Sequence, residues 1–323
     1  MKPLIRPFRE DDYPAIAAVT QATLPDNEYA SADQFRYGDE RRDPAMKFAR
    51  WMAEIGGRVV GLSYYTQYAD LYDPRMFWVM VRVIPEFQRQ GIGTALYETL
   101  LAGVCRFDPL ALRVSIREDQ TAALAFARRR GFAEYHRRHE SWLEVAAADL
   151  SGLNALETRL EHEGIRVRSV AELADDPQRD MKLYDLQWAL DQDIPIGEPI
   201  TRMAFETFRK SMLEHPDYLA DGTFVALDGE RYIGLSSFYR SGPHELHIDL
   251  TGTLPEYRGR GIATLLKMRG VRFARATGYA RIVAMNDPSN GPMLAINQKL
   301  GYVRRPAQIR LQKVFQGGQP CAS

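Results

Sequence analysis

Hydrophobic and polar positions repeat along the first half of the chain in two periods, which predict alternating strands and helices. Runs rich in β-branched and aromatic residues, such as Met76–Val83, predict buried strands, and the Gly56-Gly57 pair predicts a hairpin turn. Apolar positions that return every three or four residues predict helices. The expected strands are Leu4–Pro7, Phe48–Ile55, Arg58–Tyr68, Met76–Val83, Ala111–Ile116 and Glu134–Leu143, and the expected helices are Asp11 to about Thr20, Gly93–Arg106 and Gln120–Arg129.

The second half predicts the same order of elements, so the fold class is α/β (α+β) with two tandem domains. Each domain is expected to hold a mixed, mostly antiparallel sheet flanked by helices. The limits we expect are 1–148 for the first domain, 149–163 for a connecting helix and 164–323 for the second domain. The second-half strands are Val167–Val170, Gly222–Leu227, Arg231–Arg240, Glu245–Thr253, Arg281–Met285 and Ile309–Val314, and its helices are Asp180–Leu190, Arg202–Glu214, Ile262–Thr277 and Gly291–Lys299.

A short glycine-rich motif occurs once in each half. Gln88–Gly93 reads Gln-Arg-Gln-Gly-Ile-Gly, and Arg258–Ala263 reads Arg-Gly-Arg-Gly-Ile-Ala. Each copy follows a predicted strand and precedes a predicted helix, where converging backbone N–H groups and the helix N-terminus can hold a phosphate. The alternative, that the glycines only permit tight packing of strand and helix, is disfavoured because the surroundings are duplicated as well. No Gly-Lys-Ser/Thr follows the glycines, which argues against a P-loop nucleotide-binding protein.

Composition sets broad limits on function. The 323 residues are 45% hydrophobic and 26% charged, which is typical of a globular protein long enough for about two domains. The 42 basic and 42 acidic residues cancel, so no nucleic acid or membrane partner is expected. The N-terminus has no apolar leader and no stretch approaches membrane-spanning length, so we expect a cytoplasmic protein.

The paired motifs resemble the GNAT superfamily of acyl-CoA-dependent N-acyltransferases, in tandem form. Downstream of the second copy, Asn286–Asn290, Asn297 and Leu300-Gly301-Tyr302 resemble the segment that lies along the pantetheine arm in that family. The resemblance implies acetyl-CoA or a close thioester as donor, a small-molecule amine as acceptor and no metal. The cofactor-binding residues it implies are Val83, Gln88, Arg89, Gln90, Gly91, Ile92, Gly93 and Thr94 in the first half, and Thr253, Arg258, Gly259, Arg260, Gly261, Ile262, Ala263, Thr264, Asn286, Asn290 and Asn297 in the second.

Acyl transfer to nitrogen requires an uncharged amine, so a base is expected on the strand before the second glycine turn. Family members with a catalytic glutamate carry it at the position of His247, and regular alternation would place Asp249 on the same strand face. We therefore expect His247 and Asp249 to be catalytic and the C-terminal domain to be the main active site. An exposed polar strand face is the alternative. The polar row comprises Glu245, His247, Asp249 and Thr251, and its apolar first-half counterparts include Phe77, Val79 and Val81.

The acid that would protonate the CoA thiolate is not evident. Many relatives place a tyrosine four residues before the glycine of the Leu-Gly-aromatic motif, where this chain has Ala127 and Asn297. The first hypothesis is an acetyltransferase that acts by direct attack of a primary amine, with the N-terminal domain binding CoA without turnover. The second is a non-catalytic CoA-binding regulatory or scaffold protein, which the missing tyrosine favours.

An acceptor site is expected between the first helices of the second half and its central strands. Acidic and aromatic side chains there suit a cationic amine, although a solvated acidic loop is the commoner explanation. The candidate residues are Trp188, Asp191, Asp193 and Glu198, with Phe238, Tyr239 and His244 opposite.

Overall fold

The computed structural model describes residues 2–24, 31–195 and 200–315, and it divides the chain into two compact units. Unit 1 comprises residues 1–136 and 309–323, and unit 2 comprises residues 137–308. The closing strands of the two halves are therefore exchanged: β6 (Ala133–Glu144) continues into unit 2, and most of β13 (Gln308–Val314) belongs to unit 1. The domain limits expected from the sequence, 1–148 and 164–323, divide the chain by its sequence repeat and not by its contacts. They stay a prediction.

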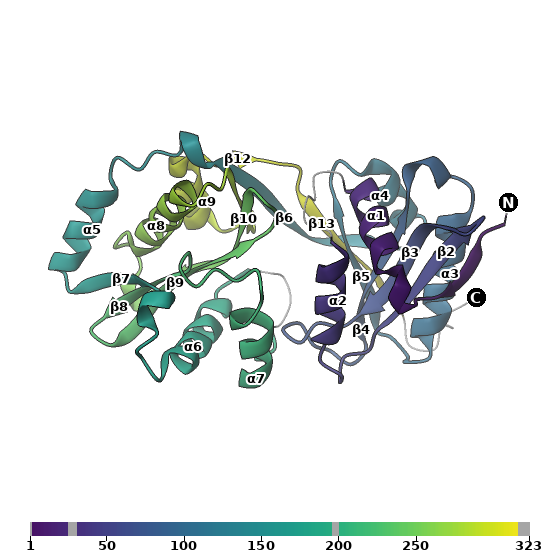
Figure 1. Ribbon diagram of the computed structural model, residues 1–323, viewed down its shortest axis with the longest axis horizontal. Helices are drawn as coiled ribbons and strands as arrows, with labels where there is room; N and C mark the ends of the chain where they lie inside the picture. The colour runs from purple at the N-terminus through teal and green to yellow at the C-terminus, as the bar shows by residue number, and fades with distance from the viewer. Residues whose placement is uncertain (1, 25–30, 196–199, 316–323) are drawn as a thin grey trace. The chain divides into compact units, whose positions relative to one another are not determined.

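Unit 1 contains a mixed sheet with the strand order β1-β2-β3-β4-β5-β13 (Figure 1). Neighbours from β1 to β4 are antiparallel, and β4 and β5 are parallel. The bounds are β1 Leu4–Pro7, β2 Ala49–Ile55, β3 Arg58–Thr66, β4 Met76–Val83, β5 Ala111–Arg117, α1 Tyr13–Thr23, α2 Ala32–Glu40, α3 Ile92–Cys105 and α4 Thr121–Arg128. Helix α2 was not expected from the sequence, yet a capping box between Ser31 and Gln34 marks its start.

Unit 2 has the corresponding strand order β6-β11-β10-β9-β8-β7, with β12 also paired to β6. Strands β10 and β11 are parallel, and the other neighbouring strands are antiparallel. The bounds are α5 Leu153–His162, β7 Ile165–Ser169, α6 Arg179–Asp191, α7 Phe205–Phe208, β8 Phe224–Asp228, β9 Arg231–Arg240, β10 Glu245–Thr253, α8 Ile262–Ala276, β11 Arg281–Asn286, α9 Gly291–Leu300 and β12 Val303–Arg304. The expected mixed, mostly antiparallel sheets are confirmed. One long helix over 202–214 was wrong, because the short α7 passes into a π-helical turn, Arg209–Leu213.

Helices cover both faces of the unit 2 sheet, and each face has its own core. Side chains of α6 and α7 pack on one face around Leu186 and Leu250. On the other face α8 packs against the sheet, as Ile248 and Val271 show, and α5 packs beside α8. The fully buried Phe238 ring fills the space left by Gly270 of α8, so the helix lies close to the sheet there.

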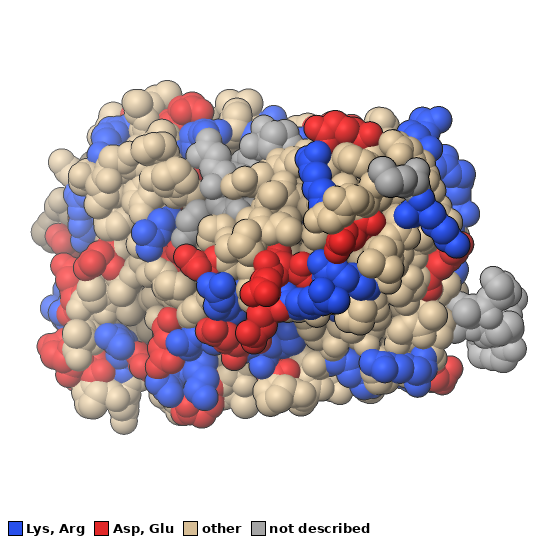
Figure 2. Space-filling view, turned by 45° about the vertical axis from the view of Figure 1, so that its right-hand side comes forward, with Lys and Arg blue, Asp and Glu red and all other residues tan. Residues whose placement is uncertain are grey.

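Charged side chains of both signs are interspersed on the surface. On the face in Figure 2, lysines and arginines lie beside aspartates and glutamates, in keeping with the equal totals of the two kinds. Across residues 2–24, 31–195 and 200–315, none of the helices has both the length and the apolar character needed to span a bilayer.

A methyl group added at Gly270 tests this close packing. Its Cβ would lie 2.1 Å from the Phe238 ring, which has no free space to move into, so Gly270→Ala is expected to lower the free energy of unfolding by about 1–3 kcal/mol. Chemical denaturation measures the change. Gly291→Ala, where a Cβ meets nothing within 4 Å, is the control and should cause no loss. Equal stability of the two variants would contradict the packing described.

Candidate active site

The two glycine turns have the same backbone conformation, although their sequences differ. In each, a short 3-10 turn passes into one extended residue and then a left-handed residue. Two positions further on, a left-handed glycine forms the N-cap of the following helix. The matched φ values are −69° and −68° at Gln88 and Arg258, 64° and 76° at Arg89 and Gly259, and 82° and 85° at Gly91 and Gly261. The sequence repeat is therefore also a repeat of local geometry.

Backbone N–H groups at both turns are free to bind an anion. Among the described residues, no backbone carbonyl accepts a hydrogen bond from the N–H groups of Gly259, Gly261 or Gly91. A Cβ built at Gly259 or Gly91 would meet nothing within 4 Å, so open space lies beside the turn. Converging N–H groups at the start of α3 and of α8 form the kind of site that binds phosphate.

Helix α5 supports the turn in unit 2. Arg159 donates a hydrogen bond of 2.7 Å to the Arg260 carbonyl, and Glu163 forms ion pairs of 2.6 Å with both Arg159 and Arg260. These hydrogen bonds, that of Arg260 first, hold the pKa of the exposed Glu163 carboxyl below its usual value. The side chain of Arg258 pairs with Asp193. The segment expected only as a connecting helix thus also positions the glycine turn.

In both units one residue of the motif is tied back to the preceding strand. Arg258 Nε donates to the Thr253 carbonyl at 3.2 Å, and Gln88 Nε2 donates to the Val83 carbonyl at 2.9 Å. In unit 1, Thr94 Oγ1 also accepts a hydrogen bond of 2.8 Å from Arg130. Thr253 and Val83, at the ends of the preceding strands, were expected to bind the cofactor. In the structure their main-chain carbonyls accept hydrogen bonds that hold the glycine turn in place.

Strands β10 and β11 stop pairing partway along their length. Their register runs from Glu245↔Arg281 to Ile248↔Ala284, whereas β10 continues to Thr253. In unit 1, the pairing of β4 and β5 likewise ends early, at Trp78↔Arg113. Each unit thus has two parallel strands that separate before the glycine turn.

A β-bulge in β10 reverses the alternation of side chains. The register to β9 shifts between Ile248 and Leu250; Ile248 packs on the α8 side, and Leu250 packs with α6. The predicted polar row was therefore wrong beyond the bulge, because Thr251 no longer shares a face with His247. Asp249 lies at the bulge itself and is exposed.

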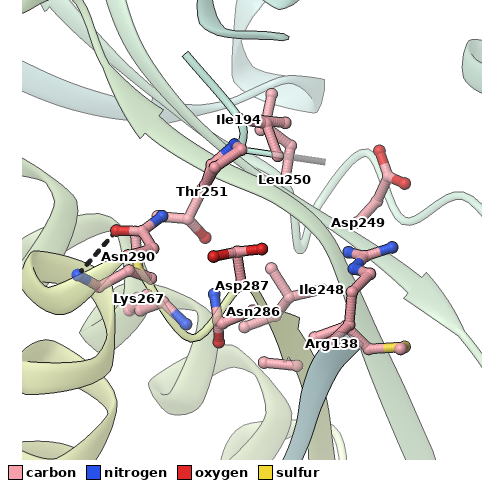
Figure 3. A pocket seen from close by; sticks show the side chains of 14 residues that line it. Arg138, Ile194, Ile248, Asp249, Leu250, Thr251, Lys267, Asn286, Asp287 and Asn290 are labelled. Carbon is pink, nitrogen blue, oxygen red and sulfur yellow. Dashed lines mark hydrogen bonds between the residues drawn. The ribbon is translucent and has the colours of Figure 1, made fainter. Parts of the chain in front are cut away.

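A cavity of about 60 Å³ lies where β10 and β11 separate. Figure 3 shows Asn290, Lys267 and Asn286 gathered at one end and Asp249 and Arg138 at the other. The lining residues are Arg138, Ile194, Pro195, Ile248, Asp249, Leu250, Thr251, Lys267, Ala284, Met285, Asn286, Asp287, Asn290 and Met293. Of the side chains expected to act in catalysis or cofactor binding, Asp249, Asn286 and Asn290 therefore line the cavity, whereas His247 does not.

His247 is a weak base in this structure. Burial, and then the positive charge of Arg138, lower the pKa of His247 to about 4. The imidazole is neutral at pH 7, but it has little affinity for a proton. Asp249 is a carboxylate at the cavity wall, and among the two expected catalytic residues it has the better access to a bound ligand.

Lys267 also lines the cavity, although it was not expected from the sequence. Its side chain is 1% exposed, and within the described part of the chain it makes no hydrogen bond or ion pair; its ammonium lies 4.9 Å from the centre of the Tyr302 ring. Burial lowers the pKa of Lys267 to about 7. The helical spacing to the buried Gly270, Val271 and Ala274 already indicated that this lysine faces the core.

Several buried polar atoms in the segments expected to bind the cofactor are unsatisfied in the described structure. Asn297, 3% exposed, donates from Nδ2 to Asn286 Oδ1 at 2.7 Å, but its own buried Oδ1 lacks a partner in the described structure. The buried hydroxyl groups of Tyr302 and Thr253 lack partners there as well. Because buried polar groups in native proteins are nearly always hydrogen-bonded, these atoms indicate a site for a polar ligand or water.

The side chains expected to bind the acceptor are not gathered in the cavity. Phe238 is fully buried, Asp193 pairs with Arg258, and Asp191 accepts a hydrogen bond of 3.0 Å from Gln187. Glu198 lies outside the described residues. In place of the expected residues, Ile194 and Pro195 from the same loop line the cavity.

Two glycine turns of this geometry, each after a strand that parts from its parallel neighbour, are the repeated feature of a tandem acyltransferase fold. The model of the Acetyltransferase (GNAT) family matches residues 10–132 and 181–302, and the chain belongs to that family. A mycothiol acetyltransferase of Catenulispora acidiphila is 27% identical over 72% of this chain and 71% of its own length. An N-alpha-acetyltransferase 30 of Schizosaccharomyces pombe is 26% identical over 40% of this chain and 82% of its own.

Solved structures share the fold of the whole chain. A tandem GNAT protein from the clavulanic acid biosynthesis pathway has a TM-score of 0.77 at 17% identity, with 98% of this chain and 100% of that one covered. A GCN5-related N-acetyltransferase from Sphaerobacter thermophilus has a TM-score of 0.70, also at 17% identity, with 99% and 98% covered. The tandem arrangement expected from the sequence is confirmed, and this chain is an acyltransferase by family.

The buried lysine predicts an unusual dependence of stability on pH. The pKa of Lys267 is about 7 in the folded protein and 10.5 ordinarily, so the unfolded chain binds the extra proton between these values. Burial of the charged lysine lowers the free energy of unfolding, and this effect is complete below about pH 7. It disappears as the pH rises towards 10.5, because the lysine is then neutral in the unfolded chain as well. We expect Lys267→Met to melt higher than the wild type at pH 7, with a difference that shrinks by pH 10. Thermal melts measure it, and the exposed Lys299→Met should show no such trend.

Proposed function

We propose that the protein transfers the acetyl group of acetyl-CoA to a primary amine of a small molecule, with unit 2 as the main active site. One observation carries the proposal: in unit 2 the opening between β10 and β11 is a cavity walled by polar side chains, among them Asp249, Thr251 and Asn286. The β4 positions of unit 1 that match Asp249 and Thr251 are the apolar Val79 and Val81, which pack in its core.

The turn of unit 2 fits the diphosphate of CoA. The free N–H groups of Gly259 to Gly261 would hold the phosphates, and Arg258 and Arg260 would exchange their carboxylate partners for them. The pantetheine arm would follow the cavity past Asn286, Asn290 and Asn297, which offer amide groups and an unsatisfied oxygen. Thr253, Ile262, Ala263 and Thr264 complete this proposed binding site. Acetyl-CoA supplies the activated thioester.

Direct attack by the acceptor needs a group that takes up a proton from the amine. We assign this role to Asp249, directly or through water, because its carboxylate lies on the cavity wall at the bulge. His247 remains the second candidate. Burial weakens it as a base, and it is not among the residues that line the cavity. The relatives named mycothiol acetyltransferase support a small-molecule acceptor for this chain.

Unit 1 is proposed to bind CoA without turnover. Its turn matches that of unit 2 in conformation, and the residues proposed to hold the cofactor are Val83, Gln88, Arg89, Gln90, Gly91, Ile92, Gly93 and Thr94. The core side chains Phe77, Val79 and Leu112 occupy the region where a polar catalytic group would be needed.

A second candidate function is a CoA-binding regulatory or scaffold protein without turnover. The observation that favours it is the pair Ala127 and Asn297, which stand where many relatives have an acidic tyrosine. This candidate would be preferred if CoA bound to the protein and none of a broad panel of amines released its thiol.

Two matched substitutions test which unit works. Gly259 and Arg89 occupy the same left-handed position, and Asp tolerates that conformation, so Gly259→Asp and Arg89→Asp each place a carboxylate at one turn. Repulsion of the diphosphate in unit 2 is expected to raise KM for acetyl-CoA at least about 10-fold in Gly259→Asp. Thiol release with a panel of amines measures it. Arg89→Asp should retain turnover; loss of activity in this variant alone would move the active site to unit 1.

A further inference from the structure

The cavity of unit 2 contains an amine that the function proposed above leaves without a role. Lys267 projects from α8, is 1% exposed, and lines the opening between β10 and β11. An ammonium in the interior is stable only with a partner, since burial of an unpaired charge is strongly unfavourable. Within the described residues the Lys267 ammonium lies 4.9 Å from the centre of the Tyr302 ring, and no carboxylate pairs with it. None of the described residues supplies that partner, and the position of Lys267 on the cavity wall makes a bound ligand a candidate for it.

The residues of this region indicate which kind of ligand Lys267 would contact. The Tyr302 ring contacts the Lys267 ammonium, and Tyr302 N donates a hydrogen bond of 3.0 Å to the Asn297 carbonyl. Among the described residues the Tyr302 hydroxyl and Asn297 Oδ1 are both unsatisfied. Asn297 stands where the superfamily resemblance leads one to expect a tyrosine that donates a proton. An amide cannot supply that proton, whereas the ammonium of Lys267 on the cavity wall can.

We propose that the Lys267 ammonium protonates the thiolate of CoA as it leaves during acetyl transfer in unit 2. The inference rests on the function proposed above and assigns its missing acid. Helix α8 leads from the diphosphate turn at Gly261 to Lys267 in about 9 Å, six residues of 1.5 Å each. An arm that runs from the turn into the cavity must therefore pass this side chain before it reaches Asp249 at the far end.

The proton balance of the step closes with groups already named. A bond forms between the amine nitrogen and the acetyl carbon, and the bond from that carbon to sulfur breaks with its electron pair left on sulfur. Lys267 gives a proton to the sulfur and becomes a neutral amine, while Asp249 takes the proton released by the nitrogen. Solvent returns both residues to their starting states after CoA leaves.

The direction of proton transfer is favourable. Burial brings the pKa of Lys267 to about 7, below the value of about 8.5 that is typical of a cysteine thiol, so the ammonium is the stronger acid. The other charged or titratable groups around the cavity are Arg138 on β6, Asp249 on β10, Asp287 after β11 and Tyr302 after α9. No charged neighbour contributes to the shift of Lys267, whose sole cause is burial.

Two substitutions separate proton donation from charge. Lys267→Met removes both, and Lys267→Arg keeps the charge but cannot release a proton at any working pH. We expect kcat to fall on the order of 100-fold in both variants, with KM for acetyl-CoA changed less than about 3-fold. In the wild type kcat should decline as the pH rises through the pKa of Lys267, and that alkaline limb should vanish in Lys267→Met. A limb that rises with pH and depends on Lys267 would make it a base and overturn the inference.

A second readout needs no turnover. The ultraviolet absorbance of the thiolate reports the pH at which bound CoA loses its thiol proton. Arginine keeps its charge at every working pH, so this pH should lie at least about one unit lower in Lys267→Arg than in Lys267→Met. Lys267 of the wild type is the stronger acid and loses its proton before the thiol, so it should lower this pH less. Lys299→Met and Tyr97→Phe, the latter at the corresponding position of unit 1, are controls expected to behave as wild type in both assays.

The two readouts distinguish failure of the inference from failure of the proposed function. Normal turnover in Lys267→Met, together with the same thiol titration in Lys267→Arg and Lys267→Met, would overturn the role of Lys267 and leave acetyl transfer intact. A thiol titration that lies lower in Lys267→Arg than in Lys267→Met, in a protein that acetylates no amine, would overturn the proposed function and keep residue 267 beside the sulfur. Absence of CoA binding by the wild type would overturn both.

Discussion

The early end of the parallel ladder between β10 and β11 is the constraint on which the site in unit 2 depends. Main-chain pairing stops at Ile248 and Ala284, although β10 continues for five residues to Thr253. A strand that leaves its neighbour exposes backbone groups and opens space inside the unit. The bulge at Asp249 accompanies this separation and turns Thr251 to the α8 side. The cavity, its carboxylate and its buried lysine all lie at this one interruption.

Buried polar groups of unit 2 that lack partners lower the free energy of unfolding, and the same groups are the ones proposed to contact the ligand. In the part of the chain that the structure describes, Lys267 is buried without a counterion, and Asn297 and Tyr302 each have one buried oxygen without a partner. Unit 1 has fewer such groups at the corresponding positions, although the buried hydroxyl of Tyr97 also lacks a partner among the described residues. There the position that corresponds to Lys267 is Tyr97, and Phe132 replaces Tyr302 in a cluster that is almost entirely apolar. Duplication thus produced one polar and one apolar version of the same interior.

Much of the fold was predictable from the sequence because duplicated motifs and strand-forming runs are local signals. The glycine turns, the strands before them and the helices after them occur where the pattern of residues placed them. The bulge in β10 was not predictable, since the residues around Asp249 show plain alternation and only the pairing with β9 reveals the shift. The exchange of β6 and β13 between the units likewise depends on long-range pairing that no local pattern encodes. The role of α5 at the turn depends on the tertiary contact between Arg159 and Arg260.

A crystal structure of the protein with CoA tests the central claim most directly. We expect electron density for the diphosphate at the amides of Gly259 to Gly261 and for the pantetheine arm between β10 and β11. We expect the sulfur to lie within hydrogen-bonding distance of Lys267. Density that places the arm elsewhere, with β10 and β11 paired beyond Ile248 and Ala284, would contradict it.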